Sequence, residues 1–287
     1  MERGKKSREV KEIAVLLVKS FFEHRVAKNA AALAYYLLFA LFPLLIFVSN
    51  LIGMLRLDIS AVMNTMYQFL PGDIVDIAVS YLDYVSSNSG KTLLWFSLVF
   101  SIWFPFRAVK GLMEDVRLSL GLGEPENKLI YRVRQLVYTV VFLVVIVLVL
   151  LLSVIGERFL VIITSHMPDD SFISSDFLPG LWQYIRFVPA GVLMVLATGG
   201  LYALSQDKKQ SAKKVLPGVF GALFAWLAVS FGFSFYVENF ADYTVIYGAL
   251  GAVIVLMIWL YLTSCILIMG AEFNAAVEKV RQTIGEF

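Results

Sequence analysis

The chain has 287 residues, of which 59% are hydrophobic and 16% are charged, against about 45–50% and 25% in soluble domains. This composition excludes an ordinary soluble domain, and long apolar stretches separated by short charged segments are typical of a protein that crosses a bilayer several times. The net charge is only +2, and the single cysteine, Cys265, excludes an internal disulfide and a multi-cysteine metal site.

Residues 1–28 are predicted to form a cytoplasmic amphipathic helix. The segment is charged, and its longest apolar run is too short for a secretory signal. Its apolar residues recur at helical spacing: Val10, Ile13, Ala14, Leu17 and Phe21. Such a helix either lies on the membrane surface or packs on the cytoplasmic ends of the membrane spans.

Residues 29–275 are predicted to form an all-α membrane domain, a bundle of six transmembrane helices. The expected spans are the long apolar stretches at about 29–55, 92–118, 136–155, 182–205, 216–237 and 245–273. An even number of spans places both termini on one side of the membrane. Most lysines and arginines fall in segments on that side, which predicts that both termini are cytoplasmic and that 276–287 is a cytoplasmic tail.

The outer segment 57–91 is too long to be a simple turn. Two amphipathic patterns, separated by Pro71 and Gly72, predict two helices capped by Asp58 and Asp73. They would lie on the outer mouth of the bundle or in the outer leaflet. The alternative is a lid that only covers apolar surface of the spans.

The second span carries charge into the membrane. Only about 15 apolar residues precede Arg107, whereas roughly 20 are needed to cross. Arg107, Lys110 and Glu114 follow at helical spacing, with Arg117 beyond them, so they share one stripe. This stripe either lines a basic cavity that opens toward the cytoplasm or snorkels to the headgroups.

Other polar and kinking residues at membrane depth complete the set of candidate positions. Arg186 near the outer end of the fourth span either holds an anionic group or snorkels to the interface. Glu272 and Asn274 close the sixth span, where the carboxylate either pairs with a second-span cation or is exposed. The tyrosines Tyr35 and Tyr36 are cavity candidates in the first span. The hinge or kink candidates are Pro43, Pro105, Pro189 and Gly248.

Three ordered blocks resemble one known family. They are Asn29 to Tyr36 running into Phe42-Pro43-Leu44, Asn239-Phe240 to Gly251, and Trp259 to Tyr261 leading to Gly270-Ala-Glu-Phe-Asn-Ala275. Together they are similar to the BrkB/YihY family of bacterial inner-membrane proteins, formerly labelled ribonuclease BN-like. The resemblance covers nearly the whole chain and implies a six-span, multi-pass protein of the bacterial plasma membrane, with suggestions of lipid transport and of virulence.

The residues do not support the ribonuclease label. RNA hydrolysis needs an acid and base pair or metal ligands that face water, and no soluble segment gathers them, so we expect no catalytic residues, no metal, no cofactor and no nucleic-acid partner. The leading hypothesis is a transporter or flippase-like protein for an anionic, lipid-like solute. The alternative is a non-transporting scaffold or accessory protein that binds lipid or partner proteins. Membrane lipids are the expected partners, and a homo-oligomer is allowed.

Overall fold

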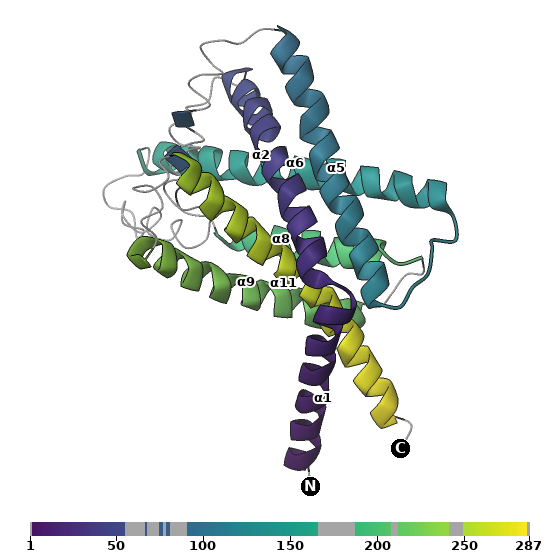
Figure 1. The fold of residues 1–287 in the computed structure, drawn as a ribbon. Coiled ribbons are helices and arrows are strands. Elements are labelled where there is room, and N and C mark those ends of the chain that lie inside the picture. Colours follow the sequence, from purple (N-terminus) through teal and green to yellow (C-terminus); the bar gives the residue numbers. More distant parts are fainter. Residues whose placement is uncertain are drawn as a thin grey trace.

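The computed structural model describes residues 2–54, 67, 75–76, 79–80, 91–165, 187–207, 212–240 and 249–285. Seven helices make up this part of the chain, which has no strand, so the all-helical prediction is confirmed for it (Figure 1). The helices are α1 (Glu2–Glu23), α2 (Val26–Met54), α5 (Lys91–Ser119), α6 (Lys128–Ser165), α8 (Phe187–Leu204), α9 (Ala212–Phe240) and α11 (Ala249–Gly285).

Helices α1 and α2 are separated by one tight turn. Arg25 occupies the left-handed region, with φ 53°, a conformation that costs free energy for a residue with a side chain. The side-chain nitrogen of Asn29 donates to the carbonyl of His24 at 3.3 Å, and the backbone N–H of Asn29 donates to the carbonyl of Arg25 at 3.1 Å. These bonds hold the turn, so that α1 leaves the bundle and packs beside the last part of α11 (Figure 1).

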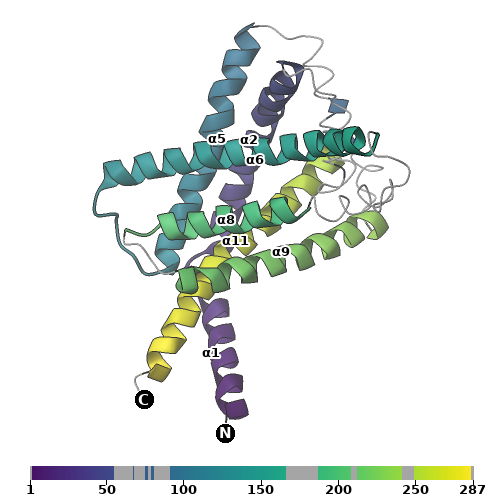
Figure 2. The same ribbon diagram turned by 180° about the vertical axis from the view of Figure 1, so that it is seen from behind.

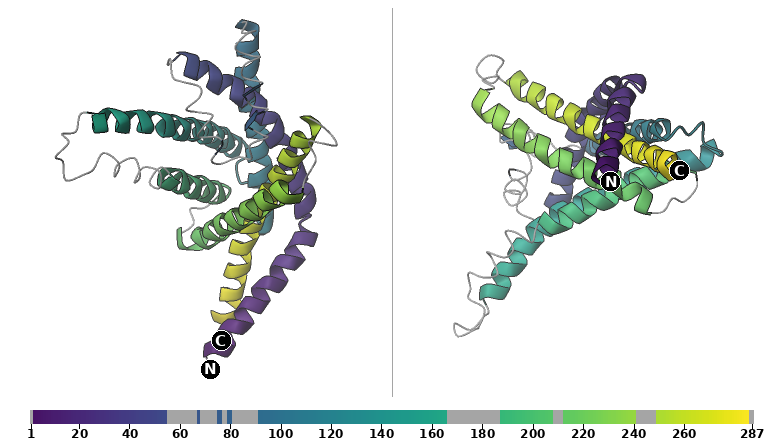
Figure 3. Two further views of the ribbon diagram at one scale, coloured as in Figure 1. Left: turned by 90° about the vertical axis from the view of Figure 1, so that its left-hand side faces the viewer. Right: turned by 90° about the horizontal axis from the view of Figure 1, so that it is seen from below.

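The helices meet at one end and diverge at the other. Figures 1 and 2 show α2 and α5 running together and α9 paired with α11, while α6 crosses behind the other helices in Figure 1 and in front of them in Figure 2. The far ends of α5, α6 and α9 point in different directions, which the two views of Figure 3 make plain. The start of α2, the end of α5 and the second half of α11 lie where the helices meet.

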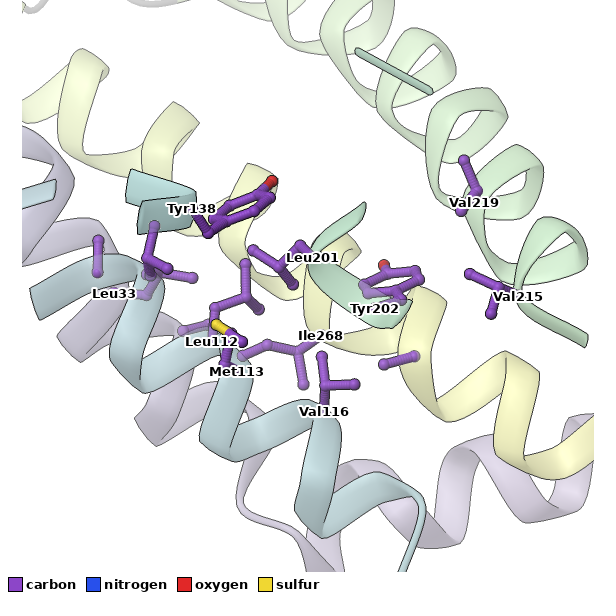
Figure 4. Close-up of a cluster of buried hydrophobic side chains, with 14 of the residues drawn as sticks. Leu33, Leu112, Met113, Val116, Tyr138, Leu201, Tyr202, Val215, Val219 and Ile268 are labelled. Carbon is purple, nitrogen blue, oxygen red and sulfur yellow. The ribbon is translucent and has the colours of Figure 1, made fainter. Parts of the chain in front are cut away.

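The main buried cluster lies at this meeting point. Figure 4 shows Leu112, Met113 and Val116 of α5 facing Ile268 of α11 and Tyr202 of α8. In a bilayer, helices gain little from burying apolar groups that lipid would also cover, so close packing and polar contacts hold them together. The core of this protein therefore coincides with the ends of its helices that are rich in polar residues.

Helices α9 and α11 approach closely through glycine. A Cβ atom added at Gly218 would overlap the carbonyl oxygen of Gly270, and one added at Gly270 would lie 2.8 Å from the Cβ of Ala222. The two backbones can approach this closely only because neither glycine has a side chain. This contact fixes the start of α9 on the second half of α11.

Four helices are long and apolar enough to cross a membrane, counting the described residues alone. They are Val26–Ile46, Lys128–Ile146, Lys214–Val237 and Val253–Thr283, and α8 contributes a shorter apolar stretch, Gly191–Leu204. They overlap four of the predicted spans. The beginning of the predicted span 182–205 lies outside the described residues, as does most of the predicted outer segment 57–91.

Candidate functional site

Arg107 of α5 contacts Tyr36 of α2. Its guanidinium donates to the Tyr36 hydroxyl at 2.9 Å and lies over the tyrosine ring, 5.2 Å from its centre. A hydroxyl oxygen and an aromatic face both attract a guanidinium cation. Tyr35 stacks edge-on against Tyr36 with ring centres 5.6 Å apart, and its own side chain is exposed. Of the two candidate tyrosines, Tyr36 is therefore the one that touches the arginine.

Arg107 has no carboxylate partner among the described residues. The salt bridges of α5 are formed further along the helix, by Lys110 with Glu114 and by Arg117 with Asp207. Arg107 belongs to the predicted second span, and a cation inside a span without a balancing anion usually marks a functional site. The positive charge of Arg107 is thus met only by a hydroxyl and an aromatic ring.

Arg117 anchors the loop that follows α5. Only 5% of Arg117 is exposed, and its guanidinium donates to the carbonyl of Gly123 at 2.7 and 3.2 Å, to that of Ser205 at 3.0 Å, and to Asp207 at 2.9 Å. Gly121, with φ 64°, ends the helix in the left-handed region that glycine favours. The donors of Arg117 are therefore committed to protein groups.

The predicted charged stripe thus divides among three environments. Arg107 faces α2, and Arg117 is enclosed beneath the loop. Between them, Lys110 and Glu114 form a partly exposed pair, with Lys110 Nζ 3.7 Å from Glu114 Oε1. Residues that share one face of an isolated helix are separated here because different neighbours cover successive turns.

Lys110 and Glu114 open onto a pocket of about 450 Å³, which we call the α5–α6 pocket. It is lined by the last turns of α5, the connecting loop and the first turns of α6: Lys110, Glu114, Arg117, Leu118, Leu122, Gly123, Glu124, Pro125, Lys128, Tyr131, Arg132 and Gln135. Four of these side chains are cationic and two are carboxylates, so the lining is positive overall. The stripe was predicted either to line a basic cavity that opens toward the cytoplasm or to snorkel to the headgroups. Three of its charged residues line this pocket, and Arg107 does not.

The start of α6 is fixed by a cap and an ion pair. The Asn127 side chain accepts from the amides of Leu129 and Ile130 at 3.0 and 3.1 Å, which satisfies two amides of the first turn. Lys128 Nζ lies 2.5 Å from Glu124 Oε2. The hydrogen bond from Lys128 lowers the pKa of Glu124 below its ordinary value, because it favours the charged carboxylate.

Glu272 lies in a second polar site, which we call the buried cluster and which comprises His24, Ser119 and Glu272. Glu272 is 2% exposed. His24 Nδ1 lies 2.6 Å from Glu272 Oε1, and the Ser119 hydroxyl donates to the same oxygen at 2.7 Å. Close by, Asn29 donates to Asp115 at 2.7 Å. The Glu272 carboxylate was predicted either to pair with a cation of the second span or to be exposed. It is enclosed, but its partners among the described residues are a histidine and a serine.

Asn274 holds α9 against α11. Its side-chain oxygen accepts from the amide of Gly218 at 2.6 Å, and its side-chain nitrogen donates to the carbonyl of Val215 at 2.9 Å. Pro217 lies inside α9, between the two bonded residues, and lacks an N–H of its own. Asn274 thus joins α11 to two backbone groups of α9 and serves packing.

The remaining candidates are placed as follows. Pro43 and Pro105 lie inside α2 and α5, and Pro189 lies in the first turn of α8. Arg186 and Gly248 lie outside the described residues.

Sequence reasoning missed the partners that tertiary structure supplies. His24, Ser119 and Asp207 were not candidates, yet each binds a charged residue of the membrane helices. Gln135 was also missed. Its position immediately before a long apolar stretch is a sequence signal for a polar group near a helix contact. Among the described residues, no group of three or more His, Cys, Asp or Glu side chains could hold a metal ion.

Long apolar helices whose polar groups gather where they meet define a helical membrane protein. Within that class, residues 17–286 match the family described as Virulence factor BrkB, and the chain belongs to this family.

The chain is also similar to individual proteins of several bacteria. It is 30% identical to the ribonuclease-like protein YfkH of Bacillus subtilis, over 89% of this chain and 91% of that protein. It is 25% identical to a UPF0761 membrane protein of Alteromonas mediterranea, over 94% and 88%, and 29% identical to one of Vibrio campbellii, over 91% and 80%. The word ribonuclease is part of the name of YfkH alone among these three. No solved structure matches the chain significantly.

Proposed function

We propose that this protein moves an anionic, lipid-like solute across the bacterial inner membrane, and that Arg107 holds the anionic group during passage. In this proposal the chain is a six-span protein with both termini in the cytoplasm, and α5 and α8 complete the set of spans. The observation that carries the proposal is a guanidinium at membrane depth that is held in place but not neutralised.

The depth follows from helix geometry. Tyr36 lies seven residues beyond Asn29, the predicted start of the first span, and each residue adds 1.5 Å along the axis. The Tyr36–Arg107 contact is therefore about 10 Å inside a hydrocarbon layer that is about 30 Å thick. Arg107 itself precedes the end of α5 at Ser119 by twelve residues, or about 18 Å of helix. With the predicted spans as the membrane boundary, the guanidinium would therefore lie well inside the membrane.

The surroundings support an anionic ligand. Tyr36 orients the guanidinium without cancelling its charge, because a neutral hydroxyl is the acceptor. An amphiphile could bring its anionic group to Arg107 while its apolar part remained in lipid.

A non-transporting scaffold is the second candidate, and one observation favours it. Glu272 and Asn274, which were candidates for substrate contact, are buried and bound to other groups of the protein. Internal contacts of this kind are expected of a protein that only holds its helices together. We therefore assign these two residues to structure under either function and place the test on Arg107.

The test is translocation of a fluorescent phosphatidylglycerol in proteoliposomes, measured by the fraction of dye that an external reductant cannot reach. We compare the parent protein, Arg107→Gln, Tyr36→Phe and empty vesicles, with Lys19→Gln of the exposed part of α1 as the charge control. The parent should exceed empty vesicles, and Arg107→Gln should be slower by about tenfold, the loss of one charge-assisted hydrogen bond. Tyr36→Phe keeps the ring beneath the cation and should fall between the two.

The outcomes separate the two candidate functions. Equal signals from the parent and from empty vesicles would reject lipid movement and favour the scaffold. Lipid translocation that exceeds empty vesicles but is equal in the parent and in Arg107→Gln would support transport and reject the role of Arg107. Each variant is first compared with the parent by size-exclusion chromatography and thermal unfolding, so that loss of the fold is not read as loss of transport.

A further inference from the structure

The α5–α6 pocket contains buried polar groups that have no partner. Gln135 is 1% exposed, and neither its amide nitrogen nor its amide oxygen makes a hydrogen bond within the described part of the protein. The hydroxyl of Tyr131, one turn earlier on α6 and next to the Gln135 amide, also makes no hydrogen bond of normal geometry within the described part of the protein. Buried polar groups are nearly always hydrogen-bonded, because leaving them unpaired costs free energy. Both side chains line the pocket.

The cations of the pocket differ in how many protein groups bind them. Arg117 is bound by three carbonyl and carboxylate groups of the protein, and Lys128 is bound to Glu124. Arg132 is exposed and makes no hydrogen bond or ion pair with any described residue. Lys110 has only the longer contact with Glu114, at 3.7 Å. The pocket therefore contains two cations with few or no protein partners, Arg132 and Lys110, beside two neutral side chains without a hydrogen-bond partner.

We propose that the α5–α6 pocket binds a phosphate group. A phosphate presents several strong acceptor oxygens and negative charge, which suit the guanidinium of Arg132, the ammonium of Lys110 and the donors of Tyr131 and Gln135. The Gln135 oxygen requires a donor, which the P–OH group of a singly protonated phosphate monoester supplies. This site is separate from Arg107 and does not require transport, so it goes beyond the function proposed above.

The phosphate can belong to a lipid headgroup or to a small phosphorylated solute. Leu118 and Leu122 line the same pocket, with 47% and 37% of their surface exposed. Exposed apolar side chains beside cations suit an amphiphile, whose acyl chains would cover them. The volume of about 450 Å³ lies within the range of ligand-binding pockets. The two sources share the phosphate chemistry and are distinguished by the choice of probe.

The test is direct binding to the purified full-length protein in phosphate-free detergent. The probes are dihexanoyl phosphatidic acid, dihexanoylglycerol, which lacks the phosphate, and inorganic phosphate. We expect the phosphatidic acid to bind and dihexanoylglycerol to bind at least about tenfold more weakly. Competition by inorganic phosphate only at much higher concentration would identify a lipid source, and equal affinity would identify a phosphorylated solute. Equal binding of the two lipids, or no binding of any phosphate probe, would overturn the proposal.

Variants locate the site. Arg132→Gln should weaken binding by about tenfold, whereas Lys279→Gln, an exposed cation on α11 outside the pocket, should leave it unchanged. Gln135→Leu should also weaken binding, while its thermal midpoint without ligand stays equal to or above that of the parent. Tyr131→Phe repeats this test by removing the hydroxyl alone. Parent-like binding by the Arg132 and Gln135 variants, or equal weakening by Lys279→Gln, would overturn the proposal.

Discussion

The last turns of α5 carry polar groups on two faces, and the two faces differ in whether the protein itself supplies their partners. On one face, Ser119 joins the buried cluster, where Glu272 receives contacts from both Ser119 and His24. On the other face, the α5–α6 pocket contains Gln135 and Tyr131 without partners. Both sites hold charged residues. The difference teaches that satisfied polar groups point to structure and unsatisfied ones to a ligand.

The comparison also explains why the intramembrane charges of this protein are not one functional unit. Enclosed groups such as Glu272 and Arg117 would leave their partners unpaired if they moved to a substrate. Arg107 and Arg132 could turn toward a ligand at much smaller cost, because no carboxylate among the described residues binds them. Mutations on the enclosed side, the groups bound to other parts of the protein, should therefore lower the free energy of unfolding. Mutations on the open side, the cations without a carboxylate partner, should weaken ligand binding.

The largest expected effect is on the enclosed side, from Gly218→Ala. The new methyl group would overlap the carbonyl oxygen of Gly270 and come within 2.5 Å of the Asn274 side chain, so α9 and α11 must separate. We expect the free energy of unfolding to fall by about 3 kcal/mol, measured from thermal unfolding in one detergent.

Gly232→Ala on the same helix is the matched control. A Cβ atom at Gly232 would meet nothing within 4 Å, and alanine favours the helix over glycine by about 1 kcal/mol. This variant should be as stable as the parent or slightly more stable. A similar loss in both variants would show that the close contact of α9 with α11 is not what makes Gly218 necessary.

The next effect is that of Glu272→Ala, which removes the shared acceptor of the buried cluster. His24 and Ser119 would lose their partner in a poorly hydrated place, and we expect a loss of about 2 kcal/mol in the free energy of unfolding. Glu278→Ala on the same helix breaks a more exposed pair with Lys214 and should cost less than about 1 kcal/mol. Parent-like stability of Glu272→Ala would remove the distinction between the two faces of α5.

The smallest effect is a gain in binding on the open side, from Glu124→Gln. Glu124 holds Lys128 at 2.5 Å in the α5–α6 pocket, so removing its charge frees a cation for phosphate. Dihexanoyl phosphatidic acid should bind about threefold more tightly, a small gain because exposed ion pairs are weak. Glu126→Gln, in the same loop but outside the pocket lining, should bind like the parent. An equal gain in both variants would indicate a general effect of surface charge.

The positions of several helices could be predicted from the apolar stretches alone. The expected first and second spans, 29–55 and 92–118, agree closely with the bounds of helices α2 and α5, although of their described residues only those of α2 contain a stretch long and apolar enough to cross a membrane. The third was expected at 136–155, whereas α6 runs over Lys128–Ser165. Hydropathy reports which residues suit lipid, but a helix continues beyond the apolar stretch wherever its backbone hydrogen bonds and caps allow it, as the Asn127 cap does here.

The sequence by itself determined that this is a helical membrane protein and that Arg107, Lys110 and Glu114 share a face of one helix. Helical periodicity and hydropathy are properties of neighbouring residues, so a single sequence reveals them. Only the tertiary structure decided which charges are enclosed. His24 and Glu272 are 248 residues apart in the chain, and hydrogen bonds act only at about 3 Å. Which of these groups are satisfied, and which remain open to a ligand, depends on how the helices pack.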